Sequence, residues 1–146
     1  MKKFEFTGET KTISLFFRTA TLHRIRAVAE FGLVKIGDLG GWIEKEENLS
    51  HEGKAWVCGD AKVFSASHVL VIGAIGSRDD FTTFFRDKDN EITVKCGCFL
   101  GKIDKFLEKV TQTHGDSKYA LVYRAAVEVA RLQIDLSGEA PKDADE

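Results

Sequence analysis

Three consecutive hexads constrain the fold of this chain more than any other feature. Residues 55–60, 61–66 and 67–72 align so that each hexad begins with a small residue and carries valine at its third position. These valines are Val57, Val63 and Val69. Six-residue spacing is typical of a triangular β-coil, in which each face has one short strand and one tight corner. Because one turn of such a coil cannot bury its own interior, we expect a solenoid fragment that other parts of the chain or other subunits complete.

The residues before the hexads are rich in β-forming side chains. Residues 2–7 and 12–18 predict two strands, and Gly8 between them predicts the turn of a hairpin. Further strands are expected over residues 22–28 and 31–38. The first half of the chain should therefore hold an antiparallel sheet.

The residues after the hexads follow a different pattern. A continuous apolar run over residues 69–75 predicts a buried strand, and residues 81–86 and 91–97 predict an antiparallel hairpin. Apolar residues at helical spacing then predict a helix over residues 103–114 and a second helix from residue 116 or 117 to about 134.

Together these segments predict one α+β domain over residues 1–136. Its β-rich half, residues 1–74, would hold the N-terminal antiparallel sheet and a short hexapeptide-like β-coil. Residues 75–136 would hold the β-hairpin and the two C-terminal helices. The acidic residues 137–146 include the single proline of the chain and are expected to form a disordered tail.

Composition limits the function. The formal net charge is −2, so no overall basic field favours DNA or RNA as a partner. No apolar run has the length of a membrane span, and three cysteines do not make a disulfide framework, so we expect a protein of the reducing cytoplasm with no membrane partner. The nucleotide-binding and hydrolase motifs with Gly-rich loops, a serine elbow or paired histidines are absent, and we expect neither a cofactor nor catalysis.

The segment from Gly76 to Thr83 is the first candidate site. It places Arg78, two aspartates, Thr82 and Thr83 at a strand–turn–strand junction. Arg78 and the backbone amides of such a turn suit a phosphate or a ribose. The alternative is a turn whose aspartates bind their own backbone.

Three residues of the C-terminal half are further candidates. Phe99 either stacks on a nucleobase or packs in the core. Arg124 lies in a mostly apolar helical stripe and needs a partner, either a phosphate or a carboxylate such as Asp104 or Glu128. His114 precedes Gly115 and suits either acid–base chemistry or an interaction with the helix C-terminus.

The remaining candidates have simpler alternatives. Cys96 and Cys98 either bind a metal or pack as small apolar side chains. The glutamates around His51 form either an acid–base site or a solvated loop. If the chain binds an anion, its basic side chains must gather locally; the candidates are Arg24, Arg26, Arg78 and Arg124.

Two blocks of sequence resemble known viral proteins. Residues 22–44 with 48–61, which include Gly59-Asp60-Ala61, resemble small phage and prophage proteins that carry Gly-Asp-Ala hexapeptide arrays. Residues 75–85, 96–101 and 113–119 resemble the C-terminal module that often follows such arrays. This module is similar to the first described type of Thoeris anti-defence protein, although the chain has only one turn's worth of hexads.

The resemblance implies a phage protein of the host cell cytoplasm that sequesters cyclic ADP-ribose-type immune signals without degrading them. It also implies an antiparallel sheet with two C-terminal helices, a homo-oligomer with pockets between subunits, and cyclic oligonucleotides as a second ligand class. Phe99 and Arg124 best match the adenine-stacking and phosphate-holding residues of such a pocket. Two other classes stay open: a self-assembling protein built on the hexads, and a hydrolase or lyase using His114 or His51.

Overall fold

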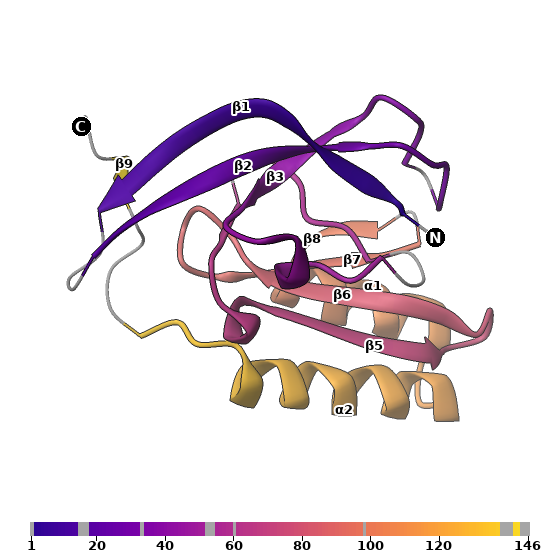
Figure 1. Ribbon diagram of the computed structural model, residues 1–146. Coiled ribbons are helices and arrows are strands. Elements are labelled where there is room, and N and C mark those ends of the chain that lie inside the picture. The colour runs from indigo at the N-terminus through magenta and orange to yellow at the C-terminus, as the bar shows by residue number, and fades with distance from the viewer. Residues whose placement is uncertain are drawn as a thin grey trace.

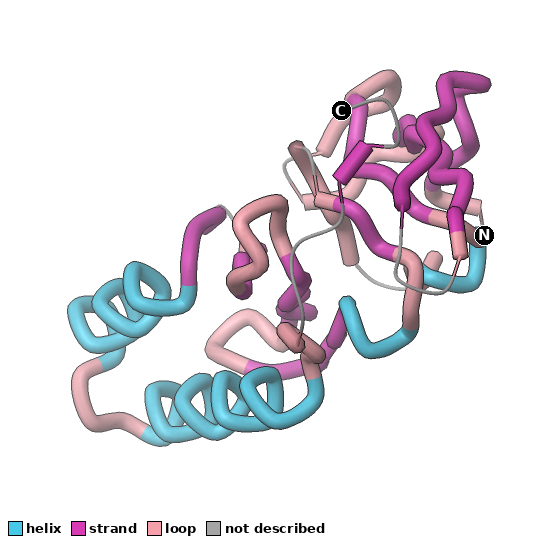
Figure 2. The backbone as a smooth tube through the Cα atoms, turned by 90° about the vertical axis from the view of Figure 1, so that its left-hand side faces the viewer, coloured by secondary structure: helices cyan, strands magenta, loops and turns pink. Residues whose placement is uncertain are grey.

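Two β-sheets and a pair of helices form three stacked layers in the computed structural model of the chain (Figure 1). The structure describes residues 2–14, 18–32, 34–51, 55–59, 61–97, 99–137 and 142–143. One sheet forms the upper layer of Figure 1, the second sheet lies in the middle, and the helices cover the lower face of the second sheet. Figure 2 shows the two helices side by side, joined by a short loop. The predicted α+β class is therefore confirmed.

The first sheet has the strand order β4-β3-β2-β1-β9. Its strands are β1 (Phe4–Ser14), β2 (Thr19–Ala27), β3 (Leu39–Ile43), β4 (Lys62–Val63) and β9 (Lys142–Asp143). Neighbouring strands are antiparallel except β3 and β4, which are parallel. The first half of the chain thus forms the expected antiparallel sheet, to which the hexads add one short strand.

Two strand predictions in this half were wrong. Gly8 does not turn the chain, because β1 runs through it and pairs with β2 along both halves. With φ at +94°, Gly8 lies instead at a register shift between Phe6 and Thr10, and glycine suits such a bulge because it tolerates positive φ. The described residues of the segment 31–38 form turns and a single bridge between Phe31 and Val34 rather than a strand.

The hexads connect the two sheets. Val57 of the first hexad and Val63 of the second are fully buried in the core between the sheets. Residues 55–59 have no regular structure, the second hexad supplies β4, and the third passes through a short 3₁₀ turn, η2 (Ala66–His68), into the second sheet. The period-six valines therefore supply core side chains at the crossing between the layers.

The second sheet is antiparallel throughout, with the order β5-β6-β7-β8. Its strands are β5 (Val69–Ile75), β6 (Asp80–Arg86), β7 (Ile92–Cys96) and β8 (Phe99–Lys102). The predicted hairpin corresponds to β6 and β7 and is confirmed. The strand predicted to be buried, β5, is an edge strand with Gly73 and Ala74 exposed, since an edge strand has a neighbour on one side only.

The predicted helices are confirmed as α1 (Ile103–His114) and α2 (Lys118–Gln133). Gly115 ends α1 with φ at +57°, and its amide donates to the Thr111 carbonyl oxygen at 2.9 Å. A non-glycine residue is disfavoured at this φ, which explains why the helix stops here. Neither helix has the length and the apolar run that a membrane span requires, as judged on the described residues.

Strand β6 divides the interior into two cores. Phe84 is fully buried and faces the helices, whereas Phe85, 1% exposed, faces the first sheet. Successive side chains of a strand point to opposite faces, so one strand supplies both cores. Of the tail predicted to be disordered, residues 142 and 143 form β9 against Ile13 and Ser14; residues 138–141 and 144–146 lie outside the described residues.

Candidate functional site

The C-terminal half contains a small pocket between the second sheet and the helices. Its cavity is about 130 Å³. Eight side chains from β7, β8, α1 and α2 line it: Cys96, Phe99, Phe106, Lys109, Val110, Thr113, His114 and Tyr123. We call it the Phe99 pocket. Two residues singled out in the sequence, Phe99 and His114, therefore share one site although 14 residues separate them.

Four of the eight side chains that line the Phe99 pocket carry aromatic rings. The ring centroids of Phe99 and Phe106 lie 5.4 Å apart, and Phe106 meets Tyr123 edge to face at 5.6 Å. His114 stacks on Tyr123 with a centroid distance of 5.7 Å and an interplanar angle of 27°. Rings held in mutual contact offer flat apolar surface with little side-chain freedom left to lose, which suits a planar ligand.

A chain of weakly polar groups lies behind these rings. The Thr82 hydroxyl donates to Cys96 Sγ at 3.4 Å, and the Cys96 thiol donates to Tyr123 Oη at 3.9 Å. Burial, together with the nearby Cys96 and Asp80, raises the pKa of Tyr123 to about 12. The phenol is therefore protonated at neutral pH and can donate a hydrogen bond.

The other predicted site residues lie at different distances from this pocket. Thr82 is 1% exposed and borders the pocket through Cys96, whereas Thr83, also 1% exposed, occupies the next position on β6 and so faces the first sheet. Arg78 is exposed in the β5–β6 turn, two residues after Gly76, which lies against Tyr123. The two threonines thus do not share a surface.

The two remaining arginines already have partners within the chain. Arg124 donates through Nη2 to the Gly115 carbonyl oxygen at 3.1 Å and to Thr111 Oγ1 at 3.3 Å. It therefore stabilises the C-terminus of α1 and contacts neither of the carboxylates expected from the sequence. Arg24 lies on β2 in the other sheet, with its guanidinium carbon 5.2 Å from the ring centroid of Trp42, so the structure separates it from the Phe99 pocket.

The glutamates near His51 form part of a structural contact. His51 Nδ1 accepts the Lys3 amide at 2.9 Å, its Nε2 lies 2.9 Å from Glu46 Oε1, and its ring stacks on Phe4. Glu46 is therefore the hydrogen-bond partner of a half-buried imidazole, Glu44 is paired with Arg18, and Glu52 lies outside the described residues.

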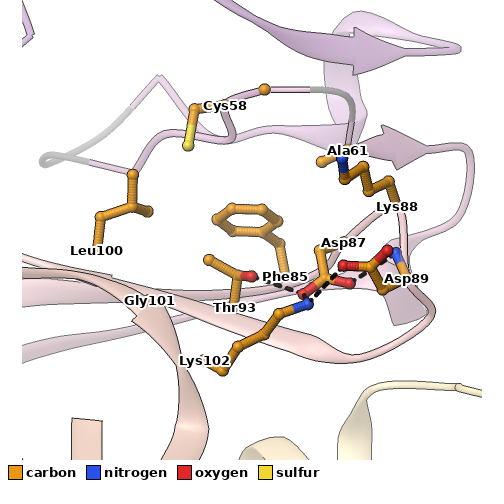
Figure 3. A pocket seen from close by; sticks show the side chains of 11 residues that line it. Cys58, Ala61, Phe85, Asp87, Lys88, Asp89, Thr93, Leu100, Gly101 and Lys102 are labelled. Atoms are coloured by element: carbon orange, nitrogen blue, oxygen red, sulfur yellow. Dashed lines mark hydrogen bonds and ion pairs between the residues drawn. The ribbon is translucent and has the colours of Figure 1, made fainter. Parts of the chain in front are cut away.

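A second pocket lies on the opposite face of the second sheet and was not predicted. Its volume is about 280 Å³, and we call it the Lys102 pocket. Figure 3 shows Cys58 and Ala61 of the hexad segment on one side, with Phe85, Leu100 and Lys102 on the other. Since Phe99 lines one pocket and Leu100 the other, the alternation of β8 assigns neighbouring residues to different cavities.

A partly buried carboxylate, that of Asp87, organises the polar edge of the Lys102 pocket. Asp87 Oδ2 accepts hydrogen bonds from Lys102 Nζ and Thr93 Oγ1, both at 2.7 Å. Its Oδ1 accepts the amides of Asp89 and Glu91 at 2.9 Å and 3.1 Å. Burial opposes the ionisation of Asp87, but these hydrogen bonds outweigh it and lower its pKa. The group is thus a fully bonded anchor of the β6–β7 turn.

Cysteine chemistry finds little support in either pocket. Burial raises the pKa of the Cys58 thiol, which keeps it protonated and a poor nucleophile or metal ligand. Cys96 is hydrogen-bonded to Thr82 and Tyr123, and Cys98 lies outside the described residues. Within the part of the chain that the structure describes, no three His, Cys, Asp or Glu side chains gather as a metal site.

Sequence reasoning missed the residues that complete each pocket. Phe106, Val110 and Tyr123 carried a helical-period signal, which marks a core face and does not separate core from pocket wall. The Lys102 pocket joins the hexads to β8 across about 40 residues of chain, and no local pattern reports such a contact.

Comparisons with known proteins give no relative for this chain. No protein-family model matches the sequence. No curated protein matches it. No solved structure matches the fold.

Proposed function

We propose that this protein binds and sequesters a nucleotide-derived signal without converting it, and that the Phe99 pocket receives the base of that ligand. The single observation that carries the proposal is the convergence of Phe99, His114 and Tyr123 from three different elements onto one pocket. The ligand class, cyclic ADP-ribose-type signals and cyclic oligonucleotides of bacterial anti-phage defence, comes from the sequence resemblance.

The size of the pocket defines how such a ligand would bind. A pocket of about 130 Å³ is smaller than the ~300–1,000 Å³ of pockets that enclose drug-sized ligands. Only one ring system would enter, and the ribose and phosphates would lie over the rim. Lys109 is exposed at this rim and Arg78 is exposed on the nearby turn, so positive charge is available where phosphates would lie.

The chemistry of the lining groups favours binding over catalysis. Tyr123 is held in its protonated form, and the Cys96 thiol donates to it rather than to a base. A nucleophile needs an adjacent base to be activated. A non-catalytic site needs only a preformed surface that matches the ligand.

Calorimetry tests the proposal directly. Purified protein is titrated with cyclic ADP-ribose isomers and with a panel of cyclic di- and trinucleotides, and the ligand is recovered after heating and analysed by mass spectrometry. We expect binding of at least one ligand, intact recovery, and a loss of affinity of about tenfold or more in Phe99→Ala, because base–aromatic stacking contributes ~1–3 kcal/mol.

The matched control is Leu100→Ala, the next residue of β8, whose side chain lines the other pocket. An equal loss in both variants would reject the Phe99 pocket as the site. Recovery of a chemically altered ligand would show an enzyme, and no heat with any member of the panel would refute the proposed ligand class.

The alternative is a self-assembling protein built on a hexapeptide β-coil. In that case Val57→Ala and Val63→Ala would abolish assembly, and the wild-type protein would bind no nucleotide of the panel. Both valines are fully buried within the core of this chain, which favours a structural role inside one subunit.

A further inference from the structure

Helix α2 is apolar on two opposite sides. Its inner side, which includes Ala120, Tyr123, Val127 and Ala130, is buried against the second sheet and α1. Its outer side also carries large apolar side chains, and these are exposed: Leu121 by 59%, Val129 by 45% and Leu132 by 89%.

These residues form one continuous surface. With Ala125, which is also exposed, the four positions are spaced by four, four and three residues, so they lie on one side of a helix. We call this surface the outer stripe of α2. Figure 1 shows α2 along the lower boundary of the molecule, with the sheet above it. Single exposed apolar residues are common, but a contiguous apolar surface marks an interaction site.

We propose that a second copy of this chain covers the outer stripe, with the two α2 helices antiparallel about a two-fold axis that passes beside Ala125. A two-fold interface must be self-complementary. Centring the pair on Ala125 places Leu121 of one copy opposite Val129 of the partner, and the small alanine lets the helices approach closely at the axis. This inference is independent of ligand binding.

The charges beside the stripe support this register. Arg124 and Glu128 lie on the same flank of α2, next to α1, and on opposite sides of the two-fold centre. In an antiparallel pair, the same flanks of the two helices meet. Measured along the helix axis, each Arg124 would then lie about 3 Å from the partner's Glu128. The Arg124 side chain is 36% exposed and that of Glu128 is 67% exposed, so both are accessible to a partner. Each also pairs within its own chain: Arg124 Nη1 lies 4.0 Å from Asp116 Oδ1, and Glu128 Oε1 lies 2.9 Å from Arg131 Nη1.

The size of the stripe sets the expected strength. Residues 121 to 132 span about 17 Å of helix. One helix face of this length buries less than the ~800 Å² per partner of a standard interface. We therefore expect a dimer that forms at micromolar concentration rather than an obligate one.

Sedimentation equilibrium of the full chain over a range of concentrations tests the dimer. We expect a reversible monomer–dimer equilibrium, and Leu132→Glu should raise the dissociation constant about tenfold or more. Because Leu132 is 89% exposed, this substitution should leave the monomer fold intact, which circular dichroism can check. The control is Ile36→Glu, which places the same charge at an aliphatic residue 67% exposed outside α2. A monomer at every concentration, or equal effects of both variants, would overturn the proposal.

Cross-linking tests the register. Ala125→Cys places the two introduced thiols beside the axis, so mild oxidation should yield a covalent dimer. Position 132 lies on the same stripe, but the two copies of this position are about 21 Å apart along the helix axis. Leu132→Cys should therefore not cross-link above the wild-type level. Efficient cross-linking of Leu132→Cys, with none for Ala125→Cys, would exclude the antiparallel register.

Discussion

Substitution of Gly76 by alanine should destabilise the protein through two separable effects. Gly76 has φ at +82°, a conformation that L-residues rarely adopt. A Cβ atom built at this position would lie 1.9 Å from Tyr123 Oη and 2.7 Å from Tyr123 Cζ. Backbone strain of this kind costs roughly 1 kcal/mol, and forced overpacking costs roughly 1–3 kcal/mol more. We expect Gly76→Ala to lose about 2–4 kcal/mol of unfolding free energy.

Gly37 provides the matched control. It has φ at +94°, and no heavy atom lies within 4 Å of a Cβ built there. Gly37→Ala should therefore lose only the backbone part, about 1 kcal/mol. Urea unfolding followed by circular dichroism measures both values, and the slope of the transition should stay unchanged if only stability changes.

A double-mutant cycle isolates the steric part. Adding Tyr123→Phe to Gly76→Ala removes the shorter of the two contacts and should recover part of the loss, although the ring carbon at 2.7 Å still crowds the new methyl group. Equal losses for Gly76→Ala and Gly37→Ala, with no coupling to Tyr123, would refute the close packing of the β5–β6 turn on this wall of the Phe99 pocket.

Three further predictions follow from buried groups. Burial and the nearby Arg86 guanidinium lower the pKa of His68 from 6.5 to about 4. As pH drops from about 6.5 to about 4, the unfolded chain therefore protonates at His68 before the folded chain does, and stability falls. His68→Gln should flatten this pH dependence of the unfolding free energy, measured by urea unfolding at several pH values. Phe84→Ala, at a fully buried position, should cost about 3–5 kcal/mol, measured by thermal unfolding. Asp87→Asn should lower the unfolding free energy by about 1–3 kcal/mol, measured by urea unfolding, because an amide cannot accept all four hydrogen bonds that the Asp87 carboxylate accepts. The control is Asp89→Asn, at a half-exposed carboxylate, which should lower it by less than about 1 kcal/mol.

Local patterns predicted the C-terminal half well. The apolar period from Ile103 onward gave α1, and Gly115 gave its end, because helix periodicity and a left-handed stop are both encoded within a few residues. The same reasoning failed at Gly8, where a glycine inside a β-rich segment was interpreted as a turn. A bulge and a turn need the same backbone freedom, and only the partner strand β2 decides between them.

The sites were predictable only in part, since pockets join residues that are distant in sequence. Phe99 and His114 were identified by residue type and position, and the fold brings them together. Thr83 was grouped with Thr82 because they are adjacent, but adjacency in a strand places side chains on opposite faces. Arg124 was identified as needing a partner, and the Gly115 carbonyl satisfies it, a group that no side-chain pattern records.

The Phe99 pocket and the outer stripe use opposite sides of the same helix. Tyr123 lines the pocket and Ala125 centres the stripe, two residues and therefore about 200° apart around α2. Ligand binding and dimerisation should thus separate genetically: Leu132→Glu should keep the affinity of the Phe99 pocket, and Phe99→Ala should keep the dimer. Loss of both properties in Leu132→Glu would instead mean that the partner's α2 contributes to the pocket near His114, which would place the binding site between the two subunits.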